Sequence, residues 1–244
     1  MSSKSADVLA RLPPCEASSP QGALTALPVA QLKPTQNSVG MDEVQAKVAK
    51  IESMSANQLA DYLLQRPIPV VVGKTSEFFA IDHHHLARAL WDAGKRDLAV
   101  PTVVAENWGP LDGNHFWKAM ARRNWLYPFD GLGAGPCKPS ALKADVGELE
   151  NDLYRSLAWR GRERYVYIKD EANPIYAEFK WANFLRSRVI FWGALLKWKG
   201  DPMEMTLKAI SELDPSDYQD RLAYALYLAG SREASGLPGF IGCR

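Results

Sequence analysis

The chain has 244 residues, of which 47% are hydrophobic and 23% charged, and its 29 basic and 28 acidic residues leave a formal net charge of +1. A chain of this length buries roughly 70–75% of its unfolded surface, so it can hold a core without disulfides or a structural metal. The composition excludes collagen-like and wholly disordered proteins. The balanced charge excludes a polyanion-binding surface spread over the whole molecule, so any basic patch is local.

The three cysteines, Cys15, Cys137 and Cys243, lie far apart and form no CxxC pair. This spacing argues against a disulfide framework or a zinc site and is typical of a reducing compartment. No apolar run approaches the ~18 residues of a membrane span, and the first residues lack the hydrophobic centre of a secretory signal. We therefore expect a cytoplasmic protein that does not bind membranes.

The first third of the chain predicts an arm, a strand and two helices. Residues 1–23 are rich in Ser, Pro and Ala with little periodicity, which predicts a mobile N-terminal arm. Apolar and polar residues alternate in residues 27–32, which predicts a short edge strand that stops at Pro34. Apolar positions near the helical period in residues 41–64 predict two helices with a break around residues 53–57.

A hairpin and a further strand are expected next. Residues 68–72 and 77–81 are β-branched or aromatic runs joined by Gly73, Lys74, Thr75 and Ser76, which is the clearest hairpin signal in the chain. A strand is then expected at residues 98–105, with Pro101 near its start or at an edge of the sheet.

The rest of the chain is expected to be mainly helical. Residues 129–140 form a Gly/Pro-rich connector, which we predict as the internal boundary. Periodic apolar positions predict helices at residues 175–198 and 217–228. The expected fold class is α+β, with a compact N-terminal unit holding a small mixed sheet over residues 24–130. A mainly helical region follows over residues 131–244.

Three consecutive histidines, His83, His84 and His85, begin a helix expected over residues 83–93, directly after the hairpin. Consecutive helical residues point about 100° apart, so the three imidazoles cannot converge on one metal ion. A strand-to-helix turn does leave backbone amides unpaired at the positive end of the helix dipole, which favours phosphate or carboxylate. Imidazoles there can donate hydrogen bonds to anionic oxygen or accept a proton near neutral pH.

Neighbouring residues extend this candidate anion site. Asp82 is the expected N-cap and Gly94 the expected C-terminal stop of the helix. Arg88 lies one turn after His84 and could add a charge-assisted contact to the same anion. An ordinary capped helix explains the same residues, with His83 half-buried and the other two imidazoles solvated. The spacing alone leaves both interpretations open.

Six motifs stand in fixed order over residues 27–188: LPVAQLKPTQNSVGMDEV, RPIPVVVG, FFAIDHHHLARAL, FWKAMARRNW, DLYRSLAWR and YAEFKWANFLR. In this combination they resemble the ParB-like nuclease family, a branch of the ParB and sulfiredoxin superfamily. The resemblance implies a ParB/sulfiredoxin-like N-terminal unit in which the turn at residues 82–85 binds nucleotide phosphates. It does not extend to sulfiredoxin chemistry, because no cysteine stands between Cys15 and Cys137.

Two further groups are candidates for binding a substrate. Lys33, Thr35, Gln36 and Ser38 lie in the loop whose superfamily equivalent contributes to the nucleotide pocket, although a turn that caps the next helix is an equal alternative.

The second group contains Asp152, Tyr154, Arg155 and Ser156, with Lys169 and Glu178 further along the chain. A phosphoryl-transfer site needs a cation and a carboxylate. Arg155 and Glu178 could supply these, with Glu178 as a candidate metal ligand, or could form a structural ion pair.

The leading hypothesis is a nuclease-like enzyme that cleaves a phosphodiester. Its expected catalytic residues are Asp82 and the three histidines, one of which acts as general acid or base. Its expected phosphate-binding residues are Lys33, Thr35, Gln36, Ser38, Arg88, Arg155 and Ser156. A nucleotide or nucleic acid is the expected ligand, and Mg²⁺ is a candidate cofactor without a recognisable ligand set. The alternatives are an ATP- or ADP-dependent kinase or nucleotide hydrolase, and a non-enzymatic nucleotide- or partner-binding protein.

Overall fold

A computed structural model describes residues 5–163, 167–168, 176–196, 234 and 237. The chain divides into two compact units, Met1–Asn151 and Asp152–Arg244, and each is described by itself. The helix predicted at residues 217–228 lies outside the described residues. Within the described residues, no helix combines the length and apolar character needed to cross a bilayer.

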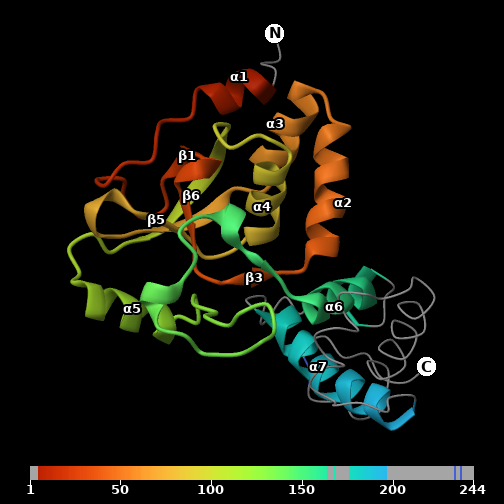
Figure 1. The fold of residues 1–244 in the computed structure, drawn as a ribbon. Coiled ribbons are helices and arrows are strands. Elements are labelled where there is room, and N and C mark those ends of the chain that lie inside the picture. Colours follow the sequence, from red (N-terminus) through yellow and green to blue (C-terminus); the bar gives the residue numbers. More distant parts are fainter. Residues whose placement is uncertain (1–4, 164–166, 169–175, 197–233, 235–236, 238–244) are drawn as a thin grey trace. The chain divides into compact units, whose positions relative to one another are not determined.

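The first unit is built on a mixed five-stranded sheet with the strand order β1-β6-β4-β5-β2 (Figure 1). The strands of this sheet are β1 (Leu24–Pro28), β2 (Leu32–Pro34), β4 (Ile68–Val72), β5 (Phe78–Ala80) and β6 (Ala99–Asn107). The neighbouring pairs β1–β6 and β4–β5 are antiparallel, whereas β4–β6 and β2–β5 are parallel. A separate parallel pair joins β3 (Ser38–Val39) to β7 (Glu150–Asn151).

Helices surround this sheet, and the expected α+β class with a small mixed sheet is confirmed. The helices of the first unit are α1 (Ser5–Ala10), α2 (Met41–Glu52), α3 (Ala56–Leu64), α4 (His84–Asp92) and α5 (Gly113–Arg122). Short 3-10 turns occur at η1 (Val29–Gln31), η2 (Lys74–Ser76), η3 (Pro139–Ala141) and η4 (Val146–Glu148). The second unit contains α6 (Leu153–Glu163) and α7 (Ala177–Leu196).

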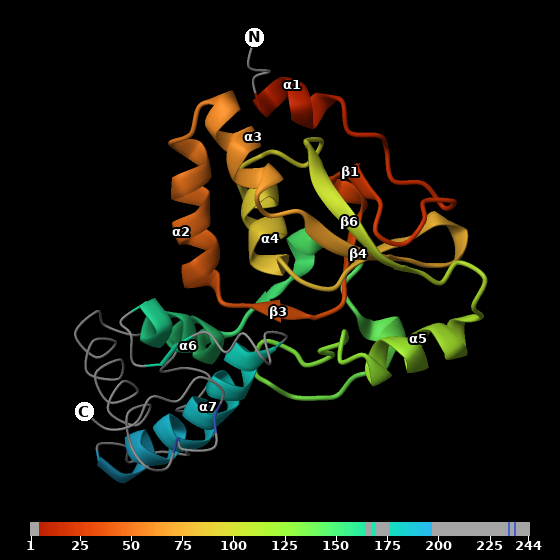
Figure 2. The same ribbon diagram turned by 180° about the vertical axis from the view of Figure 1, so that it is seen from behind.

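The alternation of side chains along β4 and β5 separates two cores. Val70 and Val72 face a cluster that includes residues of α2, α3 and α4, whereas Val71 faces a second cluster with Phe116 and Met120 of α5. Successive residues of a strand point to opposite faces, so α5 covers the other face of the sheet from α2, α3 and α4. Figure 2 shows α5 well apart from these three helices.

Several local predictions are confirmed. β4 and β5 form the predicted hairpin, and α2 and α3 are the predicted pair of helices. Helix α4 is followed by Gly94 with a φ of 71°, the left-handed conformation expected of a glycine stop. Pro101 lies near the start of β6, which is an inner strand rather than an edge.

Helix α3 begins with a capping box, which allows a simple test of local stability. The Ser55 hydroxyl accepts a hydrogen bond from the Gln58 N–H, and the Gln58 side chain accepts one from the Ser55 N–H. A Ser55→Ala substitution is expected to lower the free energy of unfolding by about 1 kcal/mol because it leaves an amide of the first turn without its acceptor. Urea denaturation measures this, with Ser53→Ala, an exposed serine at the end of α2, as the control.

The prediction of one strand at residues 27–32 is wrong. The chain leaves β1 at Pro28, passes through the 3-10 turn η1, and begins β2 at Leu32. The physical reason is the sheet order, because β1 and β2 are its two opposite edges and the chain must cross between them.

The described part of the predicted mobile arm is not an arm. Residues 5–10 form α1, and Leu9 is buried in the main core. The Cys15 N–H donates to the Ala26 carbonyl at 3.0 Å, and the Gly22 N–H donates to the Val104 carbonyl at 2.8 Å. Backbone hydrogen bonds to the sheet hold this Ser/Pro-rich segment in place. The sequence did not predict this, because the pattern of side chains contains no information on backbone hydrogen bonds.

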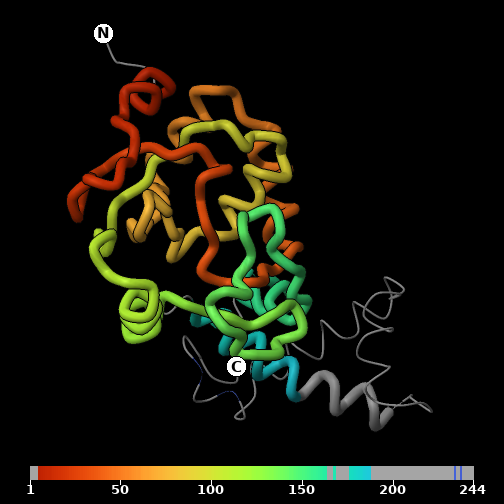
Figure 3. Tube along the Cα trace, turned by 60° about the vertical axis from the view of Figure 1, so that its left-hand side comes forward, coloured from red at the N-terminus to blue at the C-terminus, as the bar shows by residue number. Residues whose placement is uncertain are grey.

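The boundary between the units falls after Asn151 rather than at residues 129–140. The connector returns to the first unit, where the Phe129 carbonyl accepts a hydrogen bond from the Ser38 hydroxyl at 3.4 Å. The Glu150 N–H donates to the Asn37 carbonyl at 2.9 Å, beside the β3–β7 pair. The green trace of Figure 3 follows this segment. The glycines and prolines of residues 129–140 therefore form turns. They do not indicate a segment without tertiary contacts.

The second unit is centred on a buried tryptophan. Helix α7 confirms the helix predicted at residues 175–198, and Trp181 within it is 0% exposed. Its ring stacks on Tyr167, with centroids 4.2 Å apart. This tryptophan is part of the core and is not a surface platform for a base.

Candidate functional site

The turn between β5 and α4 contains an unusual backbone conformation. His83 has φ 61° and ψ 23°, in the left-handed region, and is the N-cap residue of α4. The Asp82 carboxylate accepts a hydrogen bond from the His83 N–H at 2.6 Å. The prediction of Asp82 as the N-cap is therefore wrong, because the left-handed residue shifts the cap by one position. The first helical hydrogen bond runs from the Ala87 N–H to the His83 carbonyl at 3.0 Å.

His84 is buried and holds the end of β2. Its side chain is 3% exposed, and its Nε2 accepts a hydrogen bond from the backbone N–H of Thr35 at 3.1 Å. The Thr35 hydroxyl donates to the Ala80 carbonyl at 2.8 Å and lies 3.4 Å from the same Nε2. Since Nε2 is an acceptor, the proton of the neutral ring is on Nδ1.

Burial lowers the pKa of His84 to about 4, and this outweighs the Asp82 carboxylate and a hydrogen bond with Ala80, both of which raise the pKa. The imidazole is therefore neutral at pH 7. Its acceptor nitrogen is already occupied by a backbone amide. These properties suit a residue that positions the turn better than one that exchanges protons with a substrate.

His85 makes a similar contact at the other end of the same loop. Its Nε2 accepts a hydrogen bond from the Gly40 N–H at 3.0 Å and lies 3.7 Å from a carboxylate oxygen of Glu43. The Glu43 carboxylate is also 3.4 Å from the Lys47 ammonium. His84 and His85 thus fix the start and the end of residues 35–40 to the first turn of α4.

The remaining residues of the turn lie closer to solvent. Asp82 is exposed and His83 is half-buried, whereas the next two imidazoles point into the protein. The imidazoles of His84 and His85 contact different backbone amides, those of Thr35 and Gly40. Among the described residues, no group of three or more His, Cys, Asp or Glu side chains gathers as a metal site would require.

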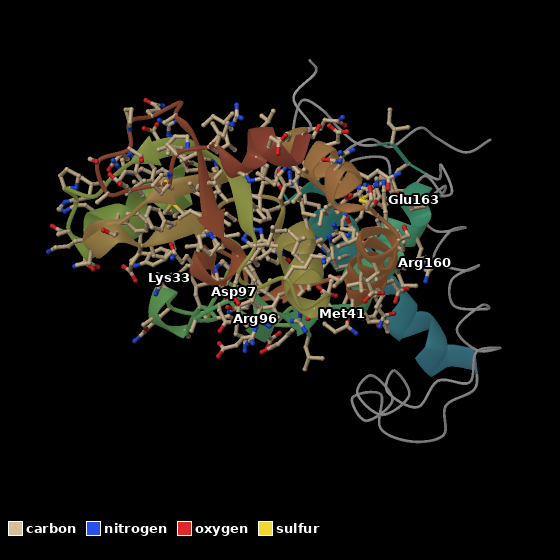
Figure 4. All side chains as sticks on the ribbon, turned by 90° about the horizontal axis from the view of Figure 1, so that it is seen from above. Lys33, Met41, Arg96, Asp97, Arg160 and Glu163 are labelled. Carbon is tan, nitrogen blue, oxygen red and sulfur yellow. The ribbon has the colours of Figure 1, made fainter. Side chains whose placement is uncertain are left out.

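The loop residues predicted to bind phosphate are occupied within the protein. Gln36 is 3% exposed and donates to the Ser38 carbonyl at 2.6 Å, and Ser38 itself is fully buried. Lys33 lies 2.9 Å from a carboxylate oxygen of Glu77 on the edge of the sheet. Figure 4 shows Lys33 at the periphery of the molecule. In this loop the side chains stabilise a buried turn. They do not cap α2, as the alternative interpretation expected, because the N-cap residue of α2 is Gly40, which has no side chain that could accept a hydrogen bond.

Arg88 is also held by the protein. Its Nε lies 2.8 and 3.0 Å from the two carboxylate oxygens of Asp92, and its Nη1 donates to the Leu149 carbonyl at 2.5 Å. The guanidinium therefore joins α4 to the segment that precedes β7, and these contacts compete with any contact to an anion.

The predicted group in the second unit forms ion pairs, and its Lys169 lies outside the described residues. Arg155 and Arg162 contact the two carboxylate oxygens of Glu178, and Ser156 is 0% exposed on α6. The structure thus brings Arg155 and Glu178 together, as either sequence-based alternative required. Two guanidinium groups on one carboxylate favour an ion pair over a metal ligand, because both oxygens already accept charge-assisted hydrogen bonds.

Comparison with known proteins defines the class. A family model described as "Putative ParB-like nuclease" matches residues 25–187. The chain belongs to this ParB-like nuclease family, as its motifs predict. It is similar to protein Atu1540 from Agrobacterium tumefaciens, with which it shares 32% sequence identity. The match to that crystal structure covers 92% of this chain and 99% of that chain, with a TM-score of 0.73. No match was found among curated proteins.

Sequence reasoning missed the partners that give His84 and His85 their positions. These partners are the backbone amides of Thr35 and Gly40, which lie 49 and 45 residues away along the chain. A backbone amide has no residue-specific signal in a sequence, so no motif could have indicated these contacts.

Proposed function

We propose that this protein hydrolyses a phosphodiester at the turn between β5 and α4. The proposal rests on membership in the ParB-like nuclease family and on the division of roles within the histidine run. His84 and His85 hold residues 35–40 against the turn, while Asp82 and His83 stay nearer the surface. This division of roles is the single observation that carries the proposal, because His83 is the imidazole of the run that lies nearest the surface. A cytoplasmic location, expected from the sequence, is part of the proposal.

In the proposed reaction, a water molecule attacks phosphorus while His83 accepts its proton. The bond from phosphorus to the leaving oxygen breaks, that oxygen takes up a proton from solvent, and protonated His83 then releases its proton to solvent. The amides of residues 84–86 precede the first helical hydrogen bond and would hold the phosphate oxygens. His84 and His85 are positioning residues in this scheme. Mg²⁺ neutralises developing negative charge in many phosphoryl transfers.

The test is a substrate screen with one variant and one matched control. Purified protein is incubated with supercoiled plasmid, single-stranded DNA, ATP, ADP and CTP, each with and without Mg²⁺. DNA cleavage is expected, and His83→Ala is expected to lower its rate by about 10²- to 10⁴-fold because the proton acceptor is lost. His115→Ala is the control, since His115 is a second accessible histidine, on α5 and paired with Asp112.

Other outcomes reject this proposal in favour of its alternatives. Nucleotide turnover without DNA cleavage would identify a kinase or nucleotide hydrolase. Thermal stabilisation by a nucleotide without any turnover would identify a non-enzymatic binding protein. Full cleavage by His83→Ala would remove this residue from the mechanism.

A further inference from the structure

A basic and aromatic surface lies on α5 and the turn that follows it. Phe116 and Met120 of this helix face the sheet and are buried, which leaves the opposite side of the helix exposed. Lys118 and Arg122 lie on that side, four residues apart, and both are exposed. We call Trp108, Lys118, Arg122, Arg123 and Trp125 the α5 surface.

The charge of this surface has one sign. Residues 113–129 contain three basic side chains and no acidic one, although the whole chain is nearly neutral. Arg123 lies 3.0 Å from a carboxylate oxygen of Glu106, and its side chain is still 57% exposed. Lys118 and Arg122 form no ion pair with any residue that the structure describes. The surface therefore offers cationic groups to an anionic partner.

Two tryptophans stand beside these charges. Asn124 adopts a left-handed φ of 56° at the end of α5, and the Trp125 N–H donates back to the Met120 carbonyl at 3.0 Å. This reversal stacks Trp125 on Trp108, with centroids 5.6 Å apart and ring planes 26° from parallel. The Arg123 guanidinium lies over the Trp125 ring, 5.4 Å from its centroid. Both tryptophans are half-buried and pack against the core cluster that contains Phe116 and Met120.

We infer that the α5 surface binds an unpaired nucleic-acid strand, which rests on the proposed nuclease function and names its substrate class. Lys118 and Arg122 contact the phosphates, and the exposed parts of the Trp125 and Arg123 planes contact the bases. Indole and guanidinium planes stack on bases whose faces are accessible, as they are in a single strand. An acidic protein would satisfy the same charges, but the base planes of a nucleic acid can in addition stack on the indole and guanidinium planes.

The chain links this surface to the proposed catalytic turn. Two residues after Trp125, the Tyr127 N–H donates to the Thr35 carbonyl at 2.9 Å. The Thr35 N–H in turn donates to Nε2 of His84. The segment that follows the α5 surface is therefore hydrogen-bonded to the same loop that contacts His84.

Binding is measured separately from cleavage, by fluorescence anisotropy in EDTA. The probes are a labelled 20-nucleotide oligothymidine and a duplex of the same length. A Lys118→Glu/Arg122→Glu variant is expected to raise the Kd for the single strand at least tenfold and to flatten its dependence on salt. Trp125→Ala is expected to raise the Kd about tenfold through lost stacking. The matched control is Arg11→Glu/Lys50→Glu, which changes the net charge equally at exposed residues outside α5.

Each other outcome has a definite meaning. Equal loss in the control pair, equal affinity for the duplex, or equal competition by polyglutamate would overturn the inference. Normal binding by the Lys118→Glu/Arg122→Glu variant would also overturn it, even if Trp125→Ala failed to fold. If the single strand binds as expected but no substrate is cleaved, the surface stands and the nuclease proposal fails. Cleavage that is unaffected by the α5 variants would leave the nuclease proposal standing without this surface.

Discussion

The free energy of unfolding is expected to fall by about 3 kcal/mol when the pH is lowered from 6.5 to 4, because of His84 alone. Burial lowers the pKa of His84 from 6.5 to about 4 in the folded chain. The unfolded chain therefore binds a proton at a higher pH than the folded chain does. The folded protein with a neutral His84 has its full stability above pH 6.5. This stability is lost progressively as the pH falls from 6.5 to 4. Protonation would also remove the acceptor for the Thr35 N–H.

Urea denaturation at several pH values between 7 and 4 measures this loss. A His84→Gln variant keeps an acceptor near Thr35 but cannot titrate, so its stability is expected to vary less with pH than that of the wild type. His115→Gln removes an exposed histidine and is the control. Nuclear magnetic resonance gives a direct check, because the His84 ring is expected to titrate near pH 4. A midpoint near 6.5 would contradict the buried position.

The histidine run shows what local sequence can and cannot predict. The change from a strand period to a helical period placed the turn correctly between β5 and α4. The left-handed conformation of His83 was not predictable, because a residue other than glycine adopts it only where its surroundings enforce it. The burial of His84 depends on Thr35, and so on tertiary packing that no local pattern contains.

The same distinction applies to the second candidate group. The sequence left Arg155 and Glu178 either as part of a phosphoryl-transfer site or as an ion pair, because the residue types suit both. The structure adds a second guanidinium, that of Arg162, to the same carboxylate. It also reveals Asp152 as a fully buried carboxylate, which the sequence could not distinguish from an exposed one. Helix periodicity predicts which face is apolar, and it does not predict which charged groups are buried with it.

Replacement of Asp152 is expected to destabilise the described part of the second unit strongly. One carboxylate oxygen accepts hydrogen bonds from the N–H groups of Tyr154 at 2.9 Å and Arg155 at 3.0 Å, which caps α6. The other accepts a hydrogen bond from Arg186 of α7 at 2.6 Å. An Asp152→Ala substitution is expected to cost about 3–5 kcal/mol, because it uncaps the helix and leaves the largely buried Arg186 without its carboxylate.

Two further variants separate the cap from the charge. Asp152→Asn keeps an oxygen acceptor for the α6 amides, so hydrogen exchange in α6 is expected to be slower than in Asp152→Ala. Burial raises the pKa of Asp152, whereas the Arg186 guanidinium opposes that rise, so Asp152 and Arg186 stabilise each other's charge. Arg186→Met in the Asp152→Ala background is therefore expected to recover part of the lost stability, as measured by urea denaturation. If the double variant is no more stable than Asp152→Ala, Asp152 stabilises this unit only by capping α6, and its ion pair with Arg186 contributes nothing.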